Sequence, residues 1–385
     1  MTYVRKGPAN RDAARPSRRA FVKVGAVMGV SMAALPRAAT AASRERVAGA
    51  SNRIHVAHIG VGAVGWMNAV CFQENATDWN TLSVAVADPS TRRLRQARAL
   101  LATGRAQDAE PRAYRDYRRI LDDNDIDAVV IAAPDASHAG VVFDALQARK
   151  HVYIASLAAP DLDVDYRVYD AWRAAGRIVQ VGGLNTSHRR YRAARDLVHS
   201  GRLGELTSVE AWSSIAGPTD RSKVDDILAQ HLPTQFASAS MIMGGLDWPT
   251  VVSCMRGGGT IHLMALMSGG WTFRFTGRTA DEPACTETVH GRDAALTVTE
   301  DQLRLAPRGP ASKGVRDTVT SVRQTGNPVH RHQKDFVDAV RQGIQPSGNL
   351  ELATRARVLA SLARMALAAG RAIAFDPAER AARVA

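Results

Sequence analysis

Short apolar runs are arranged in two different ways along this chain. In the first part they alternate with segments of helical length, and each run has the pattern of a buried strand. Strands joined through helices pair side by side in the same direction, so this part predicts a parallel sheet. The predicted strands cover residues 53–59, 82–87, 127–133 and 150–154, with a helix over Ala139–Ala148.

In the second part, strand-like segments follow one another without long helices between them. They cover residues 207–214, 251–255, 261–267 and 271–276. Such spacing favours antiparallel pairing over crossover connections. Residues 351–368 then carry apolar side chains at helical spacing, which predicts a final helix with one buried face.

A glycine-rich loop, residues 60–65, directly follows the first predicted strand and opens a helix at Trp66. Gly60 permits a tight turn, Gly62 lets the backbone approach a pyrophosphate, and Gly65 lets the helix pack close to the strand. The amide groups at the helix N-terminus attract the phosphates. The loop therefore predicts a Rossmann dinucleotide-binding domain, with these cofactor contacts: Gly60, Gly62, Ala63, Val64 and Gly65.

The second strand ends at Asp88, 23 residues after Gly65. An acid at this place can accept hydrogen bonds from ribose hydroxyls, which favours NAD. Arg92 and Arg93 follow closely and could hold the extra phosphate of NADP, so both cofactors stay open. Three glycines and an acid in register favour nucleotide binding over a domain of this kind that binds nothing.

The charge of the chain is concentrated at its start. The net charge is +13, and residues 1–41 hold eight lysines and arginines against one acid. The pair Arg18-Arg19 precedes an apolar run, residues 24–35, and then the small residues Ala39-Thr40-Ala41. The run is too short to span a bilayer, and the three features in this order are typical of a signal peptide.

The arginine pair closely resembles the motif of the bacterial Tat pathway. We therefore expect residues 1–41 to be removed, the Tat machinery to be a partner, and the mature protein to be periplasmic or secreted without a membrane anchor. The remaining basic residues are scattered and aromatic residues make up only 5% of the chain, which disfavours nucleic-acid binding. The three cysteines follow no metal or redox spacing, and no metal site is predicted.

From residue 54 to residue 377 the chain resembles the Gfo/Idh/MocA oxidoreductase superfamily, and especially its Tat-exported branch. This resemblance implies an α/β fold with two parts: an N-terminal Rossmann domain and a C-terminal α/β domain with an open, largely antiparallel sheet that often forms an oligomer interface. The segments that carry it are the glycine loop, Ala132-Ala133-Pro134-Asp135-Ala136-Ser137-His138, Ala148–Tyr153, Val181-Gly182, Leu197–Gly204, His332–Arg341 and Ala366–Pro377.

The predicted domains follow from this comparison. The Rossmann domain covers residues 53–160, the substrate and oligomerisation domain residues 161–348, and a helix within residues 349–377 packs back on the Rossmann domain. Pro134 and His138, after the third strand, are expected beside the cofactor. A homo-oligomer is an expectation of the resemblance alone.

The chain departs from the family at its catalytic motifs. Where the family has Glu-Lys-Pro, this chain has Ala155-Ser156-Leu157, and Thr234 and Ala237 fall at the positions of the family's histidine and aspartate. Serine lacks the titratable ammonium of the lysine that moves a proton at the reacting oxygen. Three candidates for catalysis remain. His231 lies one turn before Thr234 and could equally be a helix-surface or capping residue. For His138 a structural hydrogen bond is favoured over catalysis, and Tyr191 falls at a matching aromatic position.

The first functional hypothesis is an exported NAD(P)-dependent oxidoreductase acting on a sugar or polyol. An exported enzyme has no soluble pool of NAD, so its cofactor would be loaded before export and kept tightly bound. A redox-neutral NAD-dependent glycosidase stays open, as does a catalytically degenerate protein that binds a nucleotide or a carbohydrate. Loss of the catalytic motifs favours the degenerate protein, whereas the intact glycine loop favours cofactor use.

Overall fold

The computed structural model describes residues 53–103, 110–155, 162–183, 185–216, 227–244, 247–280, 284–309, 312, 314–323 and 325–385. All of them fall within one compact unit, Arg46–Ala385. The predicted signal peptide lies outside the described residues, as do Ser156 and Leu157. Among the described helices, none is long and apolar enough to cross a membrane.

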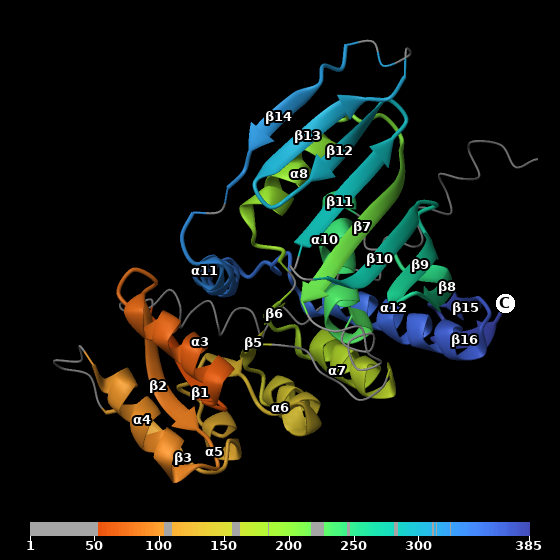
Figure 1. The fold of residues 1–385 in the computed structure, drawn as a ribbon. Coiled ribbons are helices and arrows are strands. Elements are labelled where there is room, and N and C mark those ends of the chain that lie inside the picture. Colours follow the sequence, from red (N-terminus) through yellow and green to blue (C-terminus); the bar gives the residue numbers. More distant parts are fainter. Residues whose placement is uncertain are drawn as a thin grey trace, which may run out of the picture. The chain divides into compact units, whose positions relative to one another are not determined.

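The N-terminal sheet has six strands in the order β3-β2-β1-β4-β5-β6, and every pairing in it is parallel (Figure 1). The apolar runs of the sequence form its central strands, which are buried on both faces. The sheet continues beyond residue 160, where we placed the end of the domain. The strands are β1 Ile54–Ile59, β2 Thr81–Ala87, β3 Arg112–Tyr114, β4 Ala128–Ile131, β5 His151–Ile154 and β6 Val179–Val181.

Alternate residues of these strands enter two different cores, because side chains alternate across a sheet. One core holds Ala57, Val129 and Val152 with residues of α6 and α7. The opposite core holds Val56 and Val130 with residues of α3 and of a helix from the far end of the chain, α11. The helices are α3 Ala63–Glu74, α4 Thr91–Ala102, α5 Arg118–Leu121, α6 Asp135–Gln147, α7 Leu162–Ala175 and α11 Pro328–Gln342.

The second sheet has ten strands in the order β14-β13-β12-β11-β7-β10-β9-β8-β15-β16. Its pairings are antiparallel except for β7 with β10, which run parallel. This confirms the predicted fold class. The strands are β7 Leu206–Ala216, β8 Pro249–Gly257, β9 Thr260–Met267, β10 Thr272–Ala280, β11 Ala284–Gly291, β12 Ala294–Val298, β13 Gln302–Pro307, β14 Thr318–Ser321, β15 Ile373–Asp376 and β16 Ala381–Val384.

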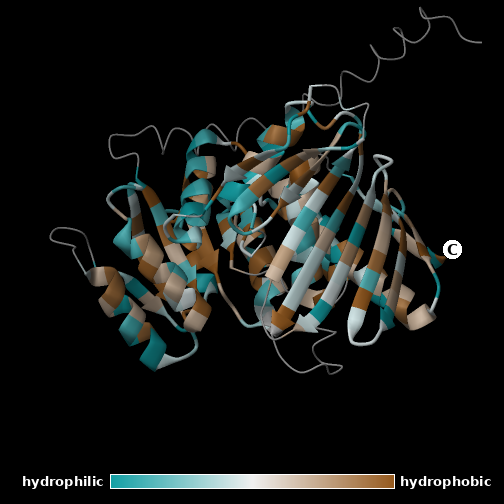
Figure 2. Ribbon diagram, turned by 45° about the horizontal axis from the view of Figure 1, so that its top comes forward, coloured by the Kyte–Doolittle hydropathy of each residue, from teal (hydrophilic) through white to brown (hydrophobic). Residues whose placement is uncertain are grey.

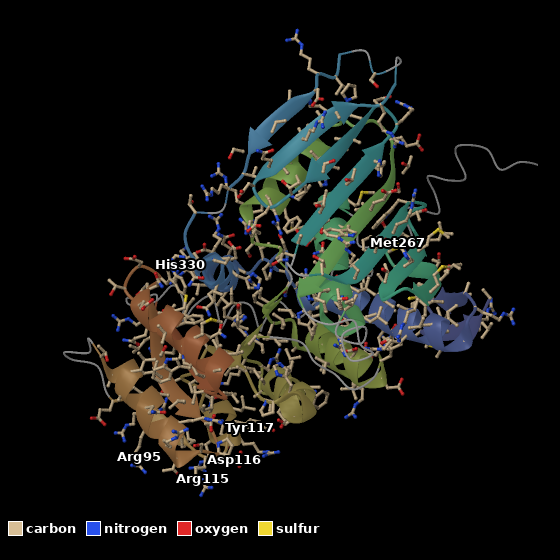
Figure 3. All side chains as sticks on the ribbon, in the orientation of Figure 1. Arg95, Arg115, Asp116, Tyr117, Met267 and His330 are labelled. Atoms are coloured by element: carbon tan, nitrogen blue, oxygen red, sulfur yellow. The ribbon has the colours of Figure 1, made fainter. Side chains whose placement is uncertain are left out.

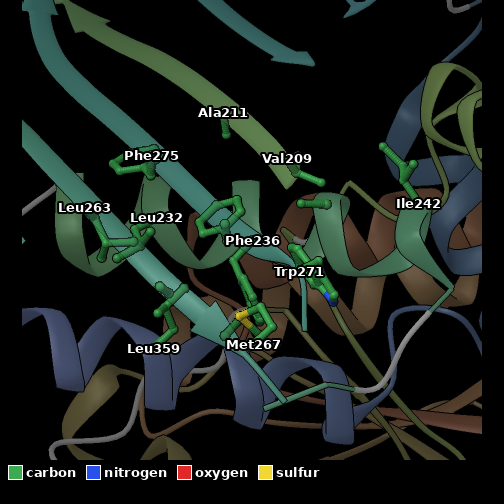
Figure 4. Packing of buried hydrophobic residues seen from close by; sticks show 14 of the residues in the cluster. Val209, Ala211, Leu232, Phe236, Ile242, Leu263, Met267, Trp271, Phe275 and Leu359 are labelled. Carbon is green, nitrogen blue, oxygen red and sulfur yellow. The ribbon is translucent and has the colours of Figure 1, made fainter. Parts of the chain in front are cut away.

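One face of the second sheet is covered by helices α8 Arg189–His199, α10 Leu232–Met243 and α12 Leu350–Ala369, with a short π-helix, η2 Ile227–His231, before α10. Phe236 of α10 meets Phe273 of β10 edge to face, with ring centroids 5.3 Å apart. Figure 4 shows Phe236 among other apolar side chains of this core, including Phe275 and Leu263. Burial of these side chains fixes the helices on the sheet.

The opposite face of this sheet is open along β8 and β9. Met255, Met264 and Leu266 are 65%, 55% and 45% exposed, whereas Leu263 and Ala265, which alternate with the exposed residues of β9, are buried. Figure 2 shows the mixture of apolar and polar residues along these strands. The sheet therefore presents apolar side chains on its uncovered face.

Two helices near the end of the chain, α11 and α12, contact the Rossmann sheet, whereas one was predicted to do so. The first turn of α12, with Leu350, Leu352 and Ala353, joins a core of the Rossmann sheet, but most of α12 packs in the core of the second domain. The helix that covers the other face of the Rossmann sheet is α11, through Phe336 and Val340.

Candidate functional site

The glycine loop is packed too tightly for side chains at two of its positions. Gly60 has a φ of +81°, and a Cβ there would lie 2.6 Å from the Ala132 carbonyl oxygen. A Cβ at Gly65 would lie 1.9 Å from the Gly60 carbonyl oxygen. Both distances are far inside van der Waals contact with backbone that cannot move away freely. These glycines thus bring β1, β4 and α3 together.

Gly62 differs from Gly60 and Gly65, because open space rather than close packing surrounds it. Its φ of −67° and ψ of −162° suit any residue, and a Cβ built there meets nothing within 4 Å. It is the N-cap of α3 and provides no side-chain cap. The first amides of the helix have no intrahelical acceptor and point at this space, beside exposed Ala63 and Val64. The open space and the free amides fit the pyrophosphate of a dinucleotide.

Asp88 fixes this loop to the second strand. Its side chain is buried, with 3% of the residue exposed. Oδ2 accepts a hydrogen bond from the Val61 amide at 3.0 Å, and Oδ1 accepts one from the Ser90 amide at 2.8 Å. Arg93 lies 3.6 Å from the same carboxylate. Asp88 therefore orders the loop in addition to the ribose contact that we predict for it.

Pro134 and His138 lie at the carboxyl end of β4, the edge where open α/β sheets bind their ligands. Pro134 is exposed and is the N-cap of α6. His138 is 2% exposed, and its Nδ1 lies 3.0 Å from the Ala133 carbonyl oxygen, to which it donates. This bond holds the turn after β4, so the structural role of His138 is the better supported one.

The expected positions of the catalytic motifs hold Ala155, Thr234 and Ala237. Thr234 donates from Oγ1 to the Gly183 carbonyl oxygen at 3.1 Å, which ties α10 to the segment after β6. Ala237 is fully buried and belongs to a core of the Rossmann sheet. Ala155 follows β5 directly. At these described positions no side chain can hold or transfer a proton at neutral pH.

His231 stands where η2 gives way to α10, one turn before Thr234. Its Nδ1 lies 3.1 Å from Oγ of Ser213, a buried residue of β7. Ser213 pairs across the sheet with Cys285 of β11. The contact between Thr234 and Gly183 ties α10 to the segment after β6, and His231 remains the acid–base candidate that the sequence predicts.

A cluster of buried polar residues lies beyond Cys285, which sequence reasoning missed. Arg190 of α8 donates to the Tyr191 hydroxyl at 3.1 Å and to the Cys285 sulfur at 3.3 Å. Burial raises the pKa of the Glu287 carboxyl to about 8, against the opposing effect of Arg190. No motif marks these residues in the sequence, because α8 and β11 are distant along the chain.

Tyr191 belongs to this cluster rather than to an open site. It is 1% exposed, and burial raises the pKa of its hydroxyl. The structure brings Tyr191 together with Arg190 and Cys285, whereas His138 contacts the Ala133 carbonyl oxygen at the edge of the Rossmann sheet. A structural role for Tyr191 is therefore better supported than catalysis.

Comparison with known proteins adds to this geometry. Residues 54–182 match the family model of the Gfo/Idh/MocA oxidoreductases, described as an oxidoreductase family with an NAD-binding Rossmann fold. An inositol 2-dehydrogenase of Rubrobacter xylanophilus is 31% identical over 165 residues, which are 43% of this chain and 45% of that protein. The chain spans less than half the length of the curated relatives that it matches. Residues 54–182 are thus similar to the NAD-binding domain of the Gfo/Idh/MocA oxidoreductases.

Solved structures share the whole fold at low identity. An NAD-binding oxidoreductase of Klebsiella pneumoniae has a TM-score of 0.72 at 16% identity, over 84% of this chain and 99% of that one. A levoglucosan dehydrogenase in complex with NADH and levoglucosan has a TM-score of 0.69 at 15% identity, with 84% and 99% covered. At such identity the likeness shows the fold, a Rossmann domain followed by a largely antiparallel sheet domain.

Proposed function

We propose that this protein is an NAD-dependent oxidoreductase that acts on a sugar or a polyol and keeps its cofactor tightly bound. The observation that carries the proposal is the loop of Gly60, Gly62 and Gly65, whose open space at Gly62 fits a pyrophosphate. Two relatives are named inositol 2-dehydrogenase, and one structural neighbour holds NADH with levoglucosan. The substrate class comes from these names and is part of the proposal.

In this proposal, different residues of the chain bind the cofactor and move the proton of the substrate. The amides of Ala63, Val64 and Gly65 bind the pyrophosphate, and Asp88 orders the loop and meets the ribose. When bound, the nicotinamide supplies or accepts a hydride. His231 holds the proton of the substrate hydroxyl, oriented through Nδ1 by Ser213. The preference for NAD over NADP rests on Asp88, because the 2′-phosphate of NADP would approach its carboxylate.

A catalytically degenerate binding protein is the second candidate, and Thr234 and Ala237 favour it. Threonine bound to a main-chain carbonyl and a fully buried alanine replace the groups that would move protons. The redox-neutral glycosidase, in which the cofactor oxidises and later reduces the same sugar, needs a proton-transfer group as much as a dehydrogenase does. Loss of these groups therefore counts against both reactions.

One purification separates these candidates. The protein is purified from its native host, denatured, and the released nucleotide is identified by its absorbance and fluorescence. Turnover is then followed with a panel of inositols, aldoses, anhydrosugars and glycosides. Released NAD(H) with turnover supports the oxidoreductase, whereas NAD(H) without turnover on any substrate would leave only the degenerate binding protein. Absence of nucleotide would refute a bound cofactor.

Export by the Tat pathway remains a proposal that rests on residues 1–41. The twin arginine, the apolar run and the small residues support it. N-terminal sequencing of the protein recovered from the periplasm or medium checks it. A mature protein that still begins at Met1 would contradict removal of the leader.

We also propose that two copies associate through the open face of the ten-stranded sheet. Met255, Met264 and Leu266 lie exposed there on neighbouring strands, and monomeric proteins rarely leave such groups of apolar side chains in water. Light scattering on the wild type and on Met264→Lys tests this. A wild-type protein that is monomeric at all concentrations would refute it.

A further inference from the structure

The buried face of α3 carries a polar bridge to α11. Asn68 of α3 and Gln333 of α11 are 3% and 0% exposed, and the Gln333 Nε2 donates to the Asn68 Oδ1. Asn68 in turn donates from Nδ2 to the Val64 carbonyl oxygen at 2.8 Å. Val64 lies in the first turn of α3, among the amides assigned to the pyrophosphate. A continuous chain of hydrogen bonds thus runs from the cofactor loop to α11.

Helix α11 is itself firmly anchored. Phe336 and Val340 pack in the core beneath it, together with Phe72 of α3. His332, the neighbour of Gln333, bonds through Nε2 to the Val181 carbonyl oxygen at 3.0 Å and through Nδ1 to the Ser187 hydroxyl at 2.7 Å. Two successive residues of α11 therefore hold the helix that follows β1 and the end of β6.

Packing alone does not account for two amides inside a helix contact. Asparagine is a weak helix former, and a buried amide is stabilising only when its groups are satisfied. The Gln333 Oε1 is buried without a hydrogen-bond partner in the described part of the chain. A methionine of similar shape would avoid that cost. The bridge is therefore less stabilising than an apolar contact at the same place, which points to a role in positioning α3.

We infer that Gln333, acting through Asn68, is a positioning residue for the dinucleotide: it holds the first turn of α3 so that its amides point at the pyrophosphate. The inference rests on the proposed function, since it concerns the same cofactor. The inference assigns a role in cofactor binding to Gln333, which lies 265 residues after Asn68 in the sequence.

The chain provides a matched control on the same pair of helices, one turn earlier in α11 and at the C-terminal end of α3. His330 of α11 bonds through Nε2 to the Asn75 Oδ1 at 2.7 Å, just after the last turn of α3 (Figure 3 labels His330). Asn75 lies 11 residues after Val64, about 16 Å along a helix axis. Loss of this distant bridge weakens the contact between α3 and α11 without reaching the loop.

The test compares Gln333→Met with His330→Phe, since each keeps the bulk of the side chain and removes one hydrogen bond. We measure the dissociation constant for NADH on nucleotide-free full-length mature protein, and the urea midpoint of each variant. Gln333→Met is expected to bind NADH about five- to tenfold more weakly, because one buried hydrogen bond is worth about that factor. His330→Phe is expected to bind NADH like the wild type.

A second variant keeps the test decisive if Gln333→Met does not fold. Asn68→Ala removes the other half of the bridge and places the best helix former in α3, so it should fold. It should weaken binding by a similar factor, and the double variant should lose no more than either single one. Unchanged binding in Asn68→Ala and Gln333→Met, or equal weakening in His330→Phe, would overturn the positioning role. A wild type that binds no NADH would instead refute the proposed function.

Discussion

Gly62→Ala tests the cofactor site most directly, because the structure predicts weaker binding of the cofactor with a nearly unchanged free energy of unfolding. The added Cβ meets nothing within 4 Å, and the backbone at φ −67° accepts an alanine. Alanine restricts the unfolded chain, which stabilises by about 0.4–1 kcal/mol. Alanine is also a poorer N-cap than glycine, which costs a similar amount. The two effects nearly cancel, so the free energy of unfolding should change by less than about 1 kcal/mol.

The methyl group does occupy space that the pyrophosphate needs. If it displaces the phosphate from one amide, a charge-assisted hydrogen bond worth about 1.5–3 kcal/mol is lost. That corresponds to binding weaker by about tenfold to a hundredfold. Gly62→Asp adds a negative charge at the same place and should abolish binding.

The assay follows tryptophan emission as NADH is added, because Trp66 lies in the first turn of α3 and is 39% exposed. The chain has six tryptophans, so the loss of energy transfer in Trp66→Phe identifies the part that reports occupancy of this loop. Urea unfolding of the same samples gives the change in stability. Wild-type affinity in Gly62→Ala and Gly62→Asp would show that the pyrophosphate does not bind here. A loss of stability well above 1 kcal/mol would show that the space at Gly62 is not open.

Three further variants test other parts of the structure. Gly65→Ala places a Cβ 1.9 Å from the Gly60 carbonyl oxygen, so its urea midpoint should fall by the equivalent of about 1–3 kcal/mol or more, and an unchanged midpoint would contradict the packing. Thr234→Val loses the hydrogen bond to Gly183 and should lower the free energy of unfolding by about 0.5–1 kcal/mol, which chemical denaturation measures. The pKa of Glu287 is raised by burial to about 8 from an ordinary value of 4.5, so the folded state keeps a proton that the unfolded chain releases. The stabilisation that comes from this retained proton is complete below pH 4.5 and is lost as pH rises towards about 8. Glu287→Gln has no such proton to lose, so its free energy of unfolding should fall less than that of the wild type across this range. Parallel curves of unfolding free energy against pH for the two proteins would refute the raised pKa of Glu287.

Much of the Rossmann domain could be predicted from the sequence because its signals are local. The strand ending at Ile59, the glycines after it and Asp88 all lie within one short segment, and backbone geometry forces them together. The strands of the second domain were also predictable from their spacing, although the parallel pairing of β7 with β10 was not. That pairing depends on which strands meet in space, and strand periodicity carries no such information.

The order of residues 60–65 is enough to predict a dinucleotide loop with three glycines, each needed for a different physical reason. The surroundings of that loop follow from the packing of the whole fold. This packing placed α11 rather than α12 over one face of the Rossmann sheet, joined Arg190 to Cys285, and joined Gln333 to Asn68. These contacts join residues far apart along the chain, and their formation depends on how whole helices and sheets pack. A local pattern fixes a turn or a helix start, whereas the partners of a buried polar side chain are fixed only when the core closes around it.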